Sequence, residues 1–233
     1  MENGSPADLF PVEPLTFSAT GFRLRHVFPT PLLVAPVNDA AALNARLRPA
    51  ILARAAREGG VVRSNDGGWQ STDDFWSWSG PAGAALLEAA TSLANRFTAL
   101  RTPEGAARGG VVNWRSNAWA NVNGESHANH PHHHPGAFWS GVYWVDAGDE
   151  APEDGGEPGF GGEFEMHDPR GILPGFSAPQ LRMAIPGCLS AGLTDYVAPQ
   201  TGTMLVFPAW LVHGVRRYTG IRPRISVAFN LSA

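Results

Sequence analysis

Residues 121–135 read NVNGESHANHPHHHP and carry five of the eight histidines in the chain. Polyhistidine runs are usually tags or metal-sequestering tails at chain ends, but this one lies in mid-chain. The stretch that follows it, residues 138–146, is rich in the aromatic and β-branched residues of strands. His132 and His134 are two residues apart, so an extended strand places both imidazoles on one face. Because neutral imidazole suits iron, zinc, copper and nickel, the stretch predicts a transition-metal site within a β-structure.

The chain from residue 111 onward has the composition of short strands separated by turns. Gly and Pro number 27 and 20, which is well above ordinary usage and favours a turn-rich β body over a helical bundle. Aromatic or β-branched segments predict strands at 111–123, 138–146, 163–167, 193–197, 203–207, 211–217 and 224–231. The pattern therefore predicts a mostly β fold, either a β-sandwich or a jelly roll.

Two amphipathic helices are predicted before these strands. Asn38 or Asp39 is placed to cap a helix whose apolar residues recur every four positions across residues 43–55. Gly80 and the following proline open a second helix with its apolar residues on one side. Residues 23–37 give an edge strand at best, since three prolines interrupt them. Both helices need an apolar surface to cover, so we expect them to pack on one face of the β-structure.

We expect one domain over residues 1–233. It consists of an irregular arm at 1–20, a helical support at 21–110 and a β core at 111–233. The acidic, Gly- and Pro-rich stretch at 147–162 is interpreted as a solvated insertion in preference to a mobile lid.

Composition excludes several classes of function. A net charge of −4 and a pI near 6.0 give no electrostatic footprint for nucleic acid or an anionic membrane. The single Cys188 excludes an intrachain disulfide and a multi-Cys zinc site. No apolar run has the length of a membrane span, and the first residues lack a signal-peptide layout. The expectation is a cytoplasmic protein that acts on a small molecule or a peptide, and a homodimer is left open.

A second conspicuous pattern lies near the end of the chain. The segment Phe207-Pro-Ala-Trp-Leu-Val-His213 ends in a lone histidine, and Arg224 and Ser226 follow on one face of a predicted strand. All 17 basic residues of the chain are arginines, so any carboxylate clamp must be an arginine fork. A guanidinium aimed inward beside a hydroxyl suits a dicarboxylate, one end of which the fork and the hydroxyl bind together.

Together these segments resemble the superfamily of iron(II)- and 2-oxoglutarate-dependent oxygenases, and more closely its group of bacterial and phage 2-oxoglutarate–Fe(II) oxygenases. The resemblance is strongest from Trp119 to Phe229 and covers most of the chain. It is carried by the segments Trp119-Ala-Asn-Val-Asn123, His132-x-His-Pro135, Ser140-Gly-Val-Tyr-Trp144, Asp168-Pro-Arg170 and Phe207–His213, and earlier by Phe28-Pro-Thr-Pro31 and Gly68-Trp69.

The resemblance implies a double-stranded β-helix (a jelly roll) with the N-terminal helices packed on one face. It implies a 2-oxoglutarate-dependent dioxygenase that uses Fe(II), 2-oxoglutarate and O₂ to hydroxylate a small molecule or a peptide. The residue roles that it implies are metal binding by His132 and His213, binding of the distal carboxylate by Arg224 with Ser226, and help in holding the co-substrate from Asn121, Asn123 and Tyr143. For Asp168 and Arg170 we expect a salt bridge within a turn.

The sequence departs from the family pattern at His134, where a carboxylate is usual. His134 can be the third metal ligand, which is the reading preferred here, or it can lie behind an open coordination position, as in halogenases. Alternatively the register differs, and His127, His130 or His133 coordinates instead.

Two other functions fit parts of the pattern. A cupin-like three-His metalloenzyme needs no 2-oxoglutarate, and the Arg224-x-Ser226 pair argues against it. A non-catalytic jelly-roll binding module with a structural metal leaves the inward arginine without a purpose, and structural zinc usually has four protein ligands.

Overall fold

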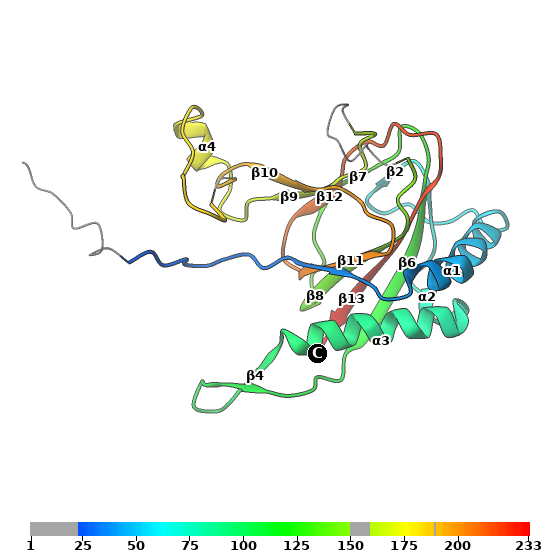
Figure 1. Cartoon of the computed structure of the whole chain (residues 1–233), viewed down its shortest axis with the longest axis horizontal. Coiled ribbons are helices and arrows are strands. Elements are labelled where there is room, and N and C mark those ends of the chain that lie inside the picture. Colours follow the sequence, from blue (N-terminus) through cyan, green and yellow to red (C-terminus); the bar gives the residue numbers. More distant parts are fainter. Residues whose placement is uncertain (1–22, 150–158, 189) are drawn as a thin grey trace, which may run out of the picture. The chain divides into compact units, whose positions relative to one another are not determined.

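The computed structural model describes residues 23–149, 159–188 and 190–233 (Figure 1). The chain divides into two units, Met1–Thr30 and Pro31–Ala233. The described part of the first unit, residues 23–30, forms no helix or strand. The arm expected at residues 1–20 and most of the expected acidic insertion lie outside the described residues.

The larger of the two main sheets has six antiparallel strands, and we call it the major sheet. Its strands, in spatial order, are β1 (Leu33–Pro36), β11 (Thr203–Pro208), β8 (Trp139–Asp146), β13 (Arg224–Ser232), β6 (Arg115–Asn123) and β3 (Trp69–Gln70). β13 lies between β8 and β6 along nearly its whole length. Since β1 ends the sheet, the edge strand expected within residues 23–37 is confirmed.

A second antiparallel sheet of five strands is called the minor sheet. Its strands, in spatial order, are β10 (Thr194–Val197), β9 (Phe164–His167), β12 (His213–Val215), β7 (Ala128–His132) and β2 (Asn65–Asp66). From β6 to β13 the chain passes back and forth between the two sheets, the connectivity of a jelly roll. A separate hairpin joins β4 (Ala99–Arg101) to β5 (Ala107–Gly109).

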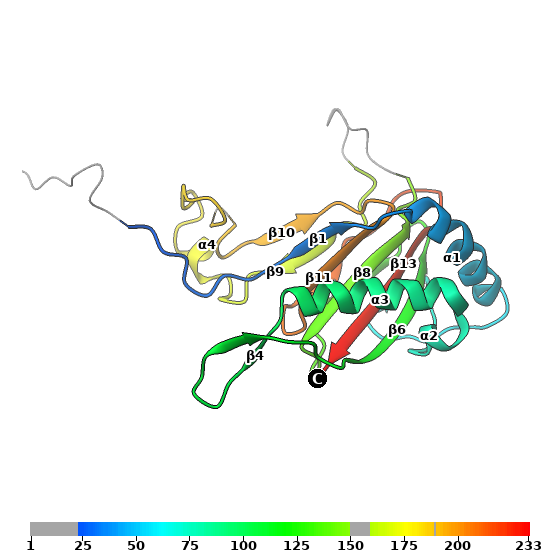
Figure 2. The same cartoon turned by 60° about the horizontal axis from the view of Figure 1, so that its bottom comes forward.

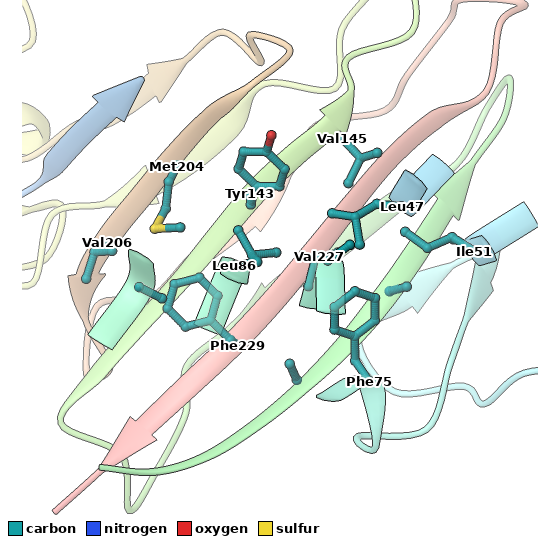
Figure 3. Close-up of a cluster of buried hydrophobic side chains, with 14 of the residues drawn as sticks. Leu47, Ile51, Phe75, Leu86, Tyr143, Val145, Met204, Val206, Val227 and Phe229 are labelled. Carbon is teal, nitrogen blue, oxygen red and sulfur yellow. The ribbon is translucent and has the colours of Figure 1, made fainter. Parts of the chain in front are cut away.

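Helices cover the outer face of the major sheet (Figure 2). α1 (Ala40–Ala55), α2 (Phe75–Trp78) and α3 (Gly80–Arg96) contribute Leu47, Ile51, Phe75 and Leu86 to a buried cluster (Figure 3). The sheet contributes every second residue of its central strands, because alternate side chains of a strand point to opposite faces. A short helix, α4 (Leu173–Ser177), follows β9.

The opposite, inward face of the major sheet meets the minor sheet. A smaller apolar cluster of Trp144, Phe164, Leu205, Phe207 and Leu211 lies there. The two core clusters thus lie on opposite faces of the major sheet. Helices cover the outer face, so a site between the two sheets is built from side chains on the inward face.

The seven strands and two long helices predicted from the sequence are all present, with small shifts of their ends. β7 was not predicted, because its sequence, Ala-Asn-His-Pro-His, lacks β-branched and aromatic strand formers. The expectation that His132 and His134 share one strand is wrong, since β7 ends at His132.

Candidate metal and co-substrate site

Three histidines converge between the two sheets. His132 ends β7 and His213 begins β12, and the two are direct partners across that ladder. His134 lies just beyond β7, where its backbone N–H donates to the carbonyl of Ala209 at 2.9 Å. Ring centroids are 4.4 Å apart for His132 and His213, 5.0 Å for His132 and His134, and 5.1 Å for His134 and His213. One ring nitrogen from each histidine lies within 4.8 Å of the other two, close enough for one metal ion.

Backbone carbonyls orient two of these imidazoles. Nδ1 of His132 lies 2.7 Å from the carbonyl oxygen of His130, and Nδ1 of His213 lies 2.8 Å from that of Leu211. A carbonyl oxygen only accepts, so Nδ1 carries the proton in each ring and Nε2 keeps its lone pair. This second hydrogen bond is the usual way in which a protein fixes the tautomer of a metal-binding histidine.

The site keeps its imidazoles neutral. Burial, followed by the charges of neighbouring histidines, lowers the pKa of His213 to about 3 and that of His134 to about 4. The pKa of His132 is also lowered, first by burial. Neutral rings have free lone pairs at physiological pH, which is the state that a metal ion binds.

The other histidines of the run do not join this group. Nδ1 of His127 accepts a hydrogen bond from the backbone N–H of Gly124 at 2.8 Å, and His130 and His133 are exposed. Within residues 23–149, 159–188 and 190–233, His132, His134 and His213 form the one cluster of three metal-binding side chains.

Arg224 and Ser226 line the same small cavity as the three histidines. The cavity has a volume of about 50 Å³, and both residues reach it from the inward face of β13. Arg224 is 2% exposed, and its Nε has no hydrogen-bond partner among the described residues. Burial lowers the pKa of its guanidinium to about 10, so the group is still charged at neutral pH. A buried charge without a paired carboxylate is costly, and an incoming anion relieves that cost.

The two asparagines expected to help both lie on the same inward face, but at different places. Asn121 is the partner of Ser226 and lines the cavity. Asn123 is the partner of Arg224 and is 3% exposed, but it lies outside the cavity lining, and its Oδ1 has no partner among the described residues.

Tyr143 does not belong to this site. It points to the outer face of the major sheet, where it packs beside Leu47 and Val145 (Figure 3). Its hydroxyl donates to Oδ1 of Asn44 in α1 at 2.8 Å, and burial raises its pKa to about 12. The prediction that Tyr143 helps to hold the co-substrate is therefore wrong. Side chains alternate along a strand, and on β8 residues 143 and 145 face the helices.

Trp144, the next residue along β8, takes the inward position instead. Trp144 pairs with Ser226 in the sheet register, as Asn121 does from the strand on the other side of β13. Its fully buried indole N–H has no hydrogen-bond acceptor among the described residues. Sequence reasoning missed it, although the two-residue period of the strand distinguishes it from Tyr143. Asp168 and Arg170 form the expected turn salt bridge at 2.8 Å, and Asp168 also accepts from the backbone N–H of Gly192.

Residues 117–230 match the family described as "Putative 2OG-Fe(II) oxygenase". Residues 117–230 belong to this family of 2-oxoglutarate–iron(II) oxygenases. The match spans the three histidines and every other residue that lines the cavity except Ser64, from Trp119 and Asn121 to Arg224 and Ser226. Members of the family use iron(II), 2-oxoglutarate and O₂ as oxidoreductases.

Solved oxygenases share the fold. A prolyl-4-hydroxylase of Pseudomonas putida is 14% identical, with a TM-score of 0.54 over 86% of this chain and 91% of that one. A Trichoplax adhaerens prolyl hydroxylase, solved with a hypoxia inducible factor peptide fragment, is 11% identical, with a TM-score of 0.54 over 86% and 83%. HygX of Streptomyces hygroscopicus, solved with nickel and 2-oxoglutarate, is 13% identical, with a TM-score of 0.54 over 87% and 83%. No curated protein matches the chain.

The site has the donors that iron(II) and 2-oxoglutarate require. Three neutral imidazoles are a suitable ligand set for a first-row metal. The guanidinium of Arg224, whose Nε has no hydrogen-bond partner among the described residues, lines the cavity with Ser226, and the two groups suit a carboxylate. None of the described helices is long and apolar enough to cross a membrane.

Proposed function

We propose that this oxygenase holds iron(II) through His132, His134 and His213, and that it hydroxylates a peptide or a small molecule. The distal carboxylate of 2-oxoglutarate is assigned to Arg224 and Ser226. The observation that carries the proposal is the fully buried Arg224, which is charged, forms no salt bridge with a carboxylate among the described residues and shares one small cavity with the three histidines.

The chain supplies geometry and a dry environment. The carbonyls of His130 and Leu211 hold two imidazoles with Nε2 free to bind the metal, and Phe164 stacks on His213 with ring centroids 5.1 Å apart. When bound, iron(II) with 2-oxoglutarate supplies the activation of O₂. His134 differs from the carboxylate usual in related enzymes in that it adds no negative charge, so the bound metal keeps its full dipositive charge.

Two further side chains are assigned to the co-substrate. Asn121 and Trp144 flank Ser226 on the neighbouring strands, so each is about 5 Å from it along the sheet. We propose that the amide of Asn121 and the indole N–H of Trp144 donate to oxygen atoms of 2-oxoglutarate. Trp144, like Asn123, lies outside the cavity lining, but its buried indole N–H has no partner among the described residues, which supports the assignment because burying a donor without an acceptor is costly.

The test is anaerobic titration of the iron(II)-loaded protein with 2-oxoglutarate. We expect a weak visible charge-transfer band in the wild type and no band in Arg224→Ala. If iron binds but the wild type gives no band, the site is a three-His metalloenzyme that does not use 2-oxoglutarate.

A further inference from the structure

A wide groove adjoins the small metal cavity. It has a volume of about 820 Å³, within the usual size range of ligand sites, and it shares Ser64, Trp119, His132 and His134 with the metal cavity. His132 and His134 therefore border both the metal cavity and the groove. A substrate bound in the groove lies next to the metal without entering the co-substrate cavity.

Gln70 is the feature of this groove that the proposed chemistry does not explain. Gln70 lines the groove and is 6% exposed, yet its side-chain Oε1 has no hydrogen-bond partner among the described residues. The neighbouring Trp69 points the other way and donates to the carbonyl of Glu58, so Gln70 faces inward. Leaving a buried amide unpaired costs stability, which indicates a partner that arrives with the ligand.

The sheet register relates Gln70 to the co-substrate residues. Ser226, Asn121 and Gln70 are successive partners across β13, β6 and β3. Neighbouring strands are about 5 Å apart, so Gln70 lies roughly 10 Å from Ser226, with Asn121 between them. The row passes from the proposed co-substrate end of the cavity to the groove.

The charges of the groove favour a neutral, polar ligand. Arg63 and Asp73 both line it, and Asp73 accepts a hydrogen bond from Asn117 at 3.4 Å. One charged side chain of each sign means that the Arg and Asp of the lining do not by themselves select a strongly anionic or cationic substrate. Most of the remaining polar groups are hydroxyls and amides.

We propose that the groove binds a peptide-like substrate and that Gln70 positions it by pairing with one of its backbone amides. This inference rests on the proposed function, because a substrate in the groove can react only if a metal is bound at the adjoining histidines. A side-chain amide carries one acceptor and one NH₂ donor, so a single peptide group satisfies both. Trp119, whose ring centroid is 5.5 Å from that of His134, supplies the apolar surface beside the metal end.

The experiment uses the full chain loaded with iron(II) and 2-oxoglutarate without oxygen. A pooled library of N-acetylated, C-amidated tripeptides is screened by affinity selection and mass spectrometry. The strongest binder is then measured by calorimetry beside analogues in which an ester replaces each peptide amide in turn. We expect one ester to bind the wild type about 5- to 10-fold more weakly, since a lost hydrogen bond contributes about 1 kcal/mol.

Gln70→Met keeps the length of the side chain and removes its hydrogen bonds. We expect this variant to bind the tripeptide about 5- to 10-fold more weakly and to bind the amide and that ester equally. Gln200→Met changes an exposed glutamine in a turn and should bind as the wild type does. The circular dichroism of each variant checks its fold.

Three results would overturn the inference. The first is the absence of any tripeptide binder, and the second is stronger binding of neutral oligosaccharides than of tripeptides. The third is an unchanged preference for the amide over the ester in Gln70→Met. A failure of the proposed function can be told apart from a failure of this inference. It shows before any tripeptide is added, because the protein then does not load iron(II) or 2-oxoglutarate.

Discussion

His132 and His213 lie directly opposite each other across the β7–β12 ladder, with ring centroids 4.4 Å apart. This pairing joins the histidine-rich stretch to a distant strand and brings together two ligands of the proposed metal site. His134 completes the group from outside the ladder, so it is the position at which the set of ligands can be tested most sharply.

Substitution of the histidines tests the metal ligands. We expect His132→Ala and His213→Ala to abolish iron retention, as measured by metal analysis after gel filtration. His134→Ala should lose most of the iron, whereas His134→Asp should retain it by supplying a carboxylate ligand. His133→Ala, on an exposed neighbour, is the matched control. Full occupancy in His134→Ala would show that His134 is not a ligand.

Arg224→Met should have opposite effects on the stability of the protein and on its affinity for 2-oxoglutarate. Replacing an unpaired buried charge with an apolar side chain of similar length should raise the free energy of unfolding of the metal-free protein by about 1–4 kcal/mol. The same change should weaken 2-oxoglutarate binding at least 100-fold, because it removes the charge-assisted fork. Chemical denaturation and calorimetry measure the two effects. A variant that is less stable yet binds 2-oxoglutarate normally contradicts the assignment.

Trp144→Phe and Tyr143→Phe form a matched pair on adjacent residues of β8. Trp144→Phe should weaken 2-oxoglutarate binding about 10-fold, since it removes the proposed indole donor. Tyr143→Phe should leave that affinity unchanged and lower the free energy of unfolding by about 1–2 kcal/mol, since it leaves Asn44 unpaired. Equal effects of the two changes on 2-oxoglutarate binding would refute the distinction between the two faces of the strand.

The lowered histidine pKa values predict how the stability of the metal-free protein depends on pH. In the unfolded chain His213 takes up a proton below about pH 6.5, whereas in the folded chain its pKa is about 3. Its contribution to stability is therefore present above pH 6.5 and is lost as the pH falls toward 3. We expect His213→Asn to flatten this pH dependence by at most about 1.4 kcal/mol per pH unit. Denaturant titrations at a series of pH values measure the slope, and an unchanged slope would contradict the prediction.

The sequence by itself determined the strands from β6 onward apart from β7, the two long helices and the principal chemical groups of the proposed site. Strand and helix periods are local, so seven strands and two long helices were placed correctly. His132, His213, Arg224 and Ser226 were recognisable because their spacing follows an established pattern. The salt bridge between Asp168 and Arg170 is also local, and it formed as expected.

Only the tertiary structure decided which side chains share a space. Tyr143 was assigned to the site from its place in a motif, but the sheet turns it toward α1 and turns Trp144 inward. β7 was not predicted, because Ala-Asn-His-Pro-His becomes a strand through its pairing with β12 and β2, which are distant in the chain. Gln70 gave no signal in the sequence, since a lone glutamine is ordinarily a surface residue. Its burial and its register beside Asn121 follow from long-range pairing of strands, which local propensity does not encode.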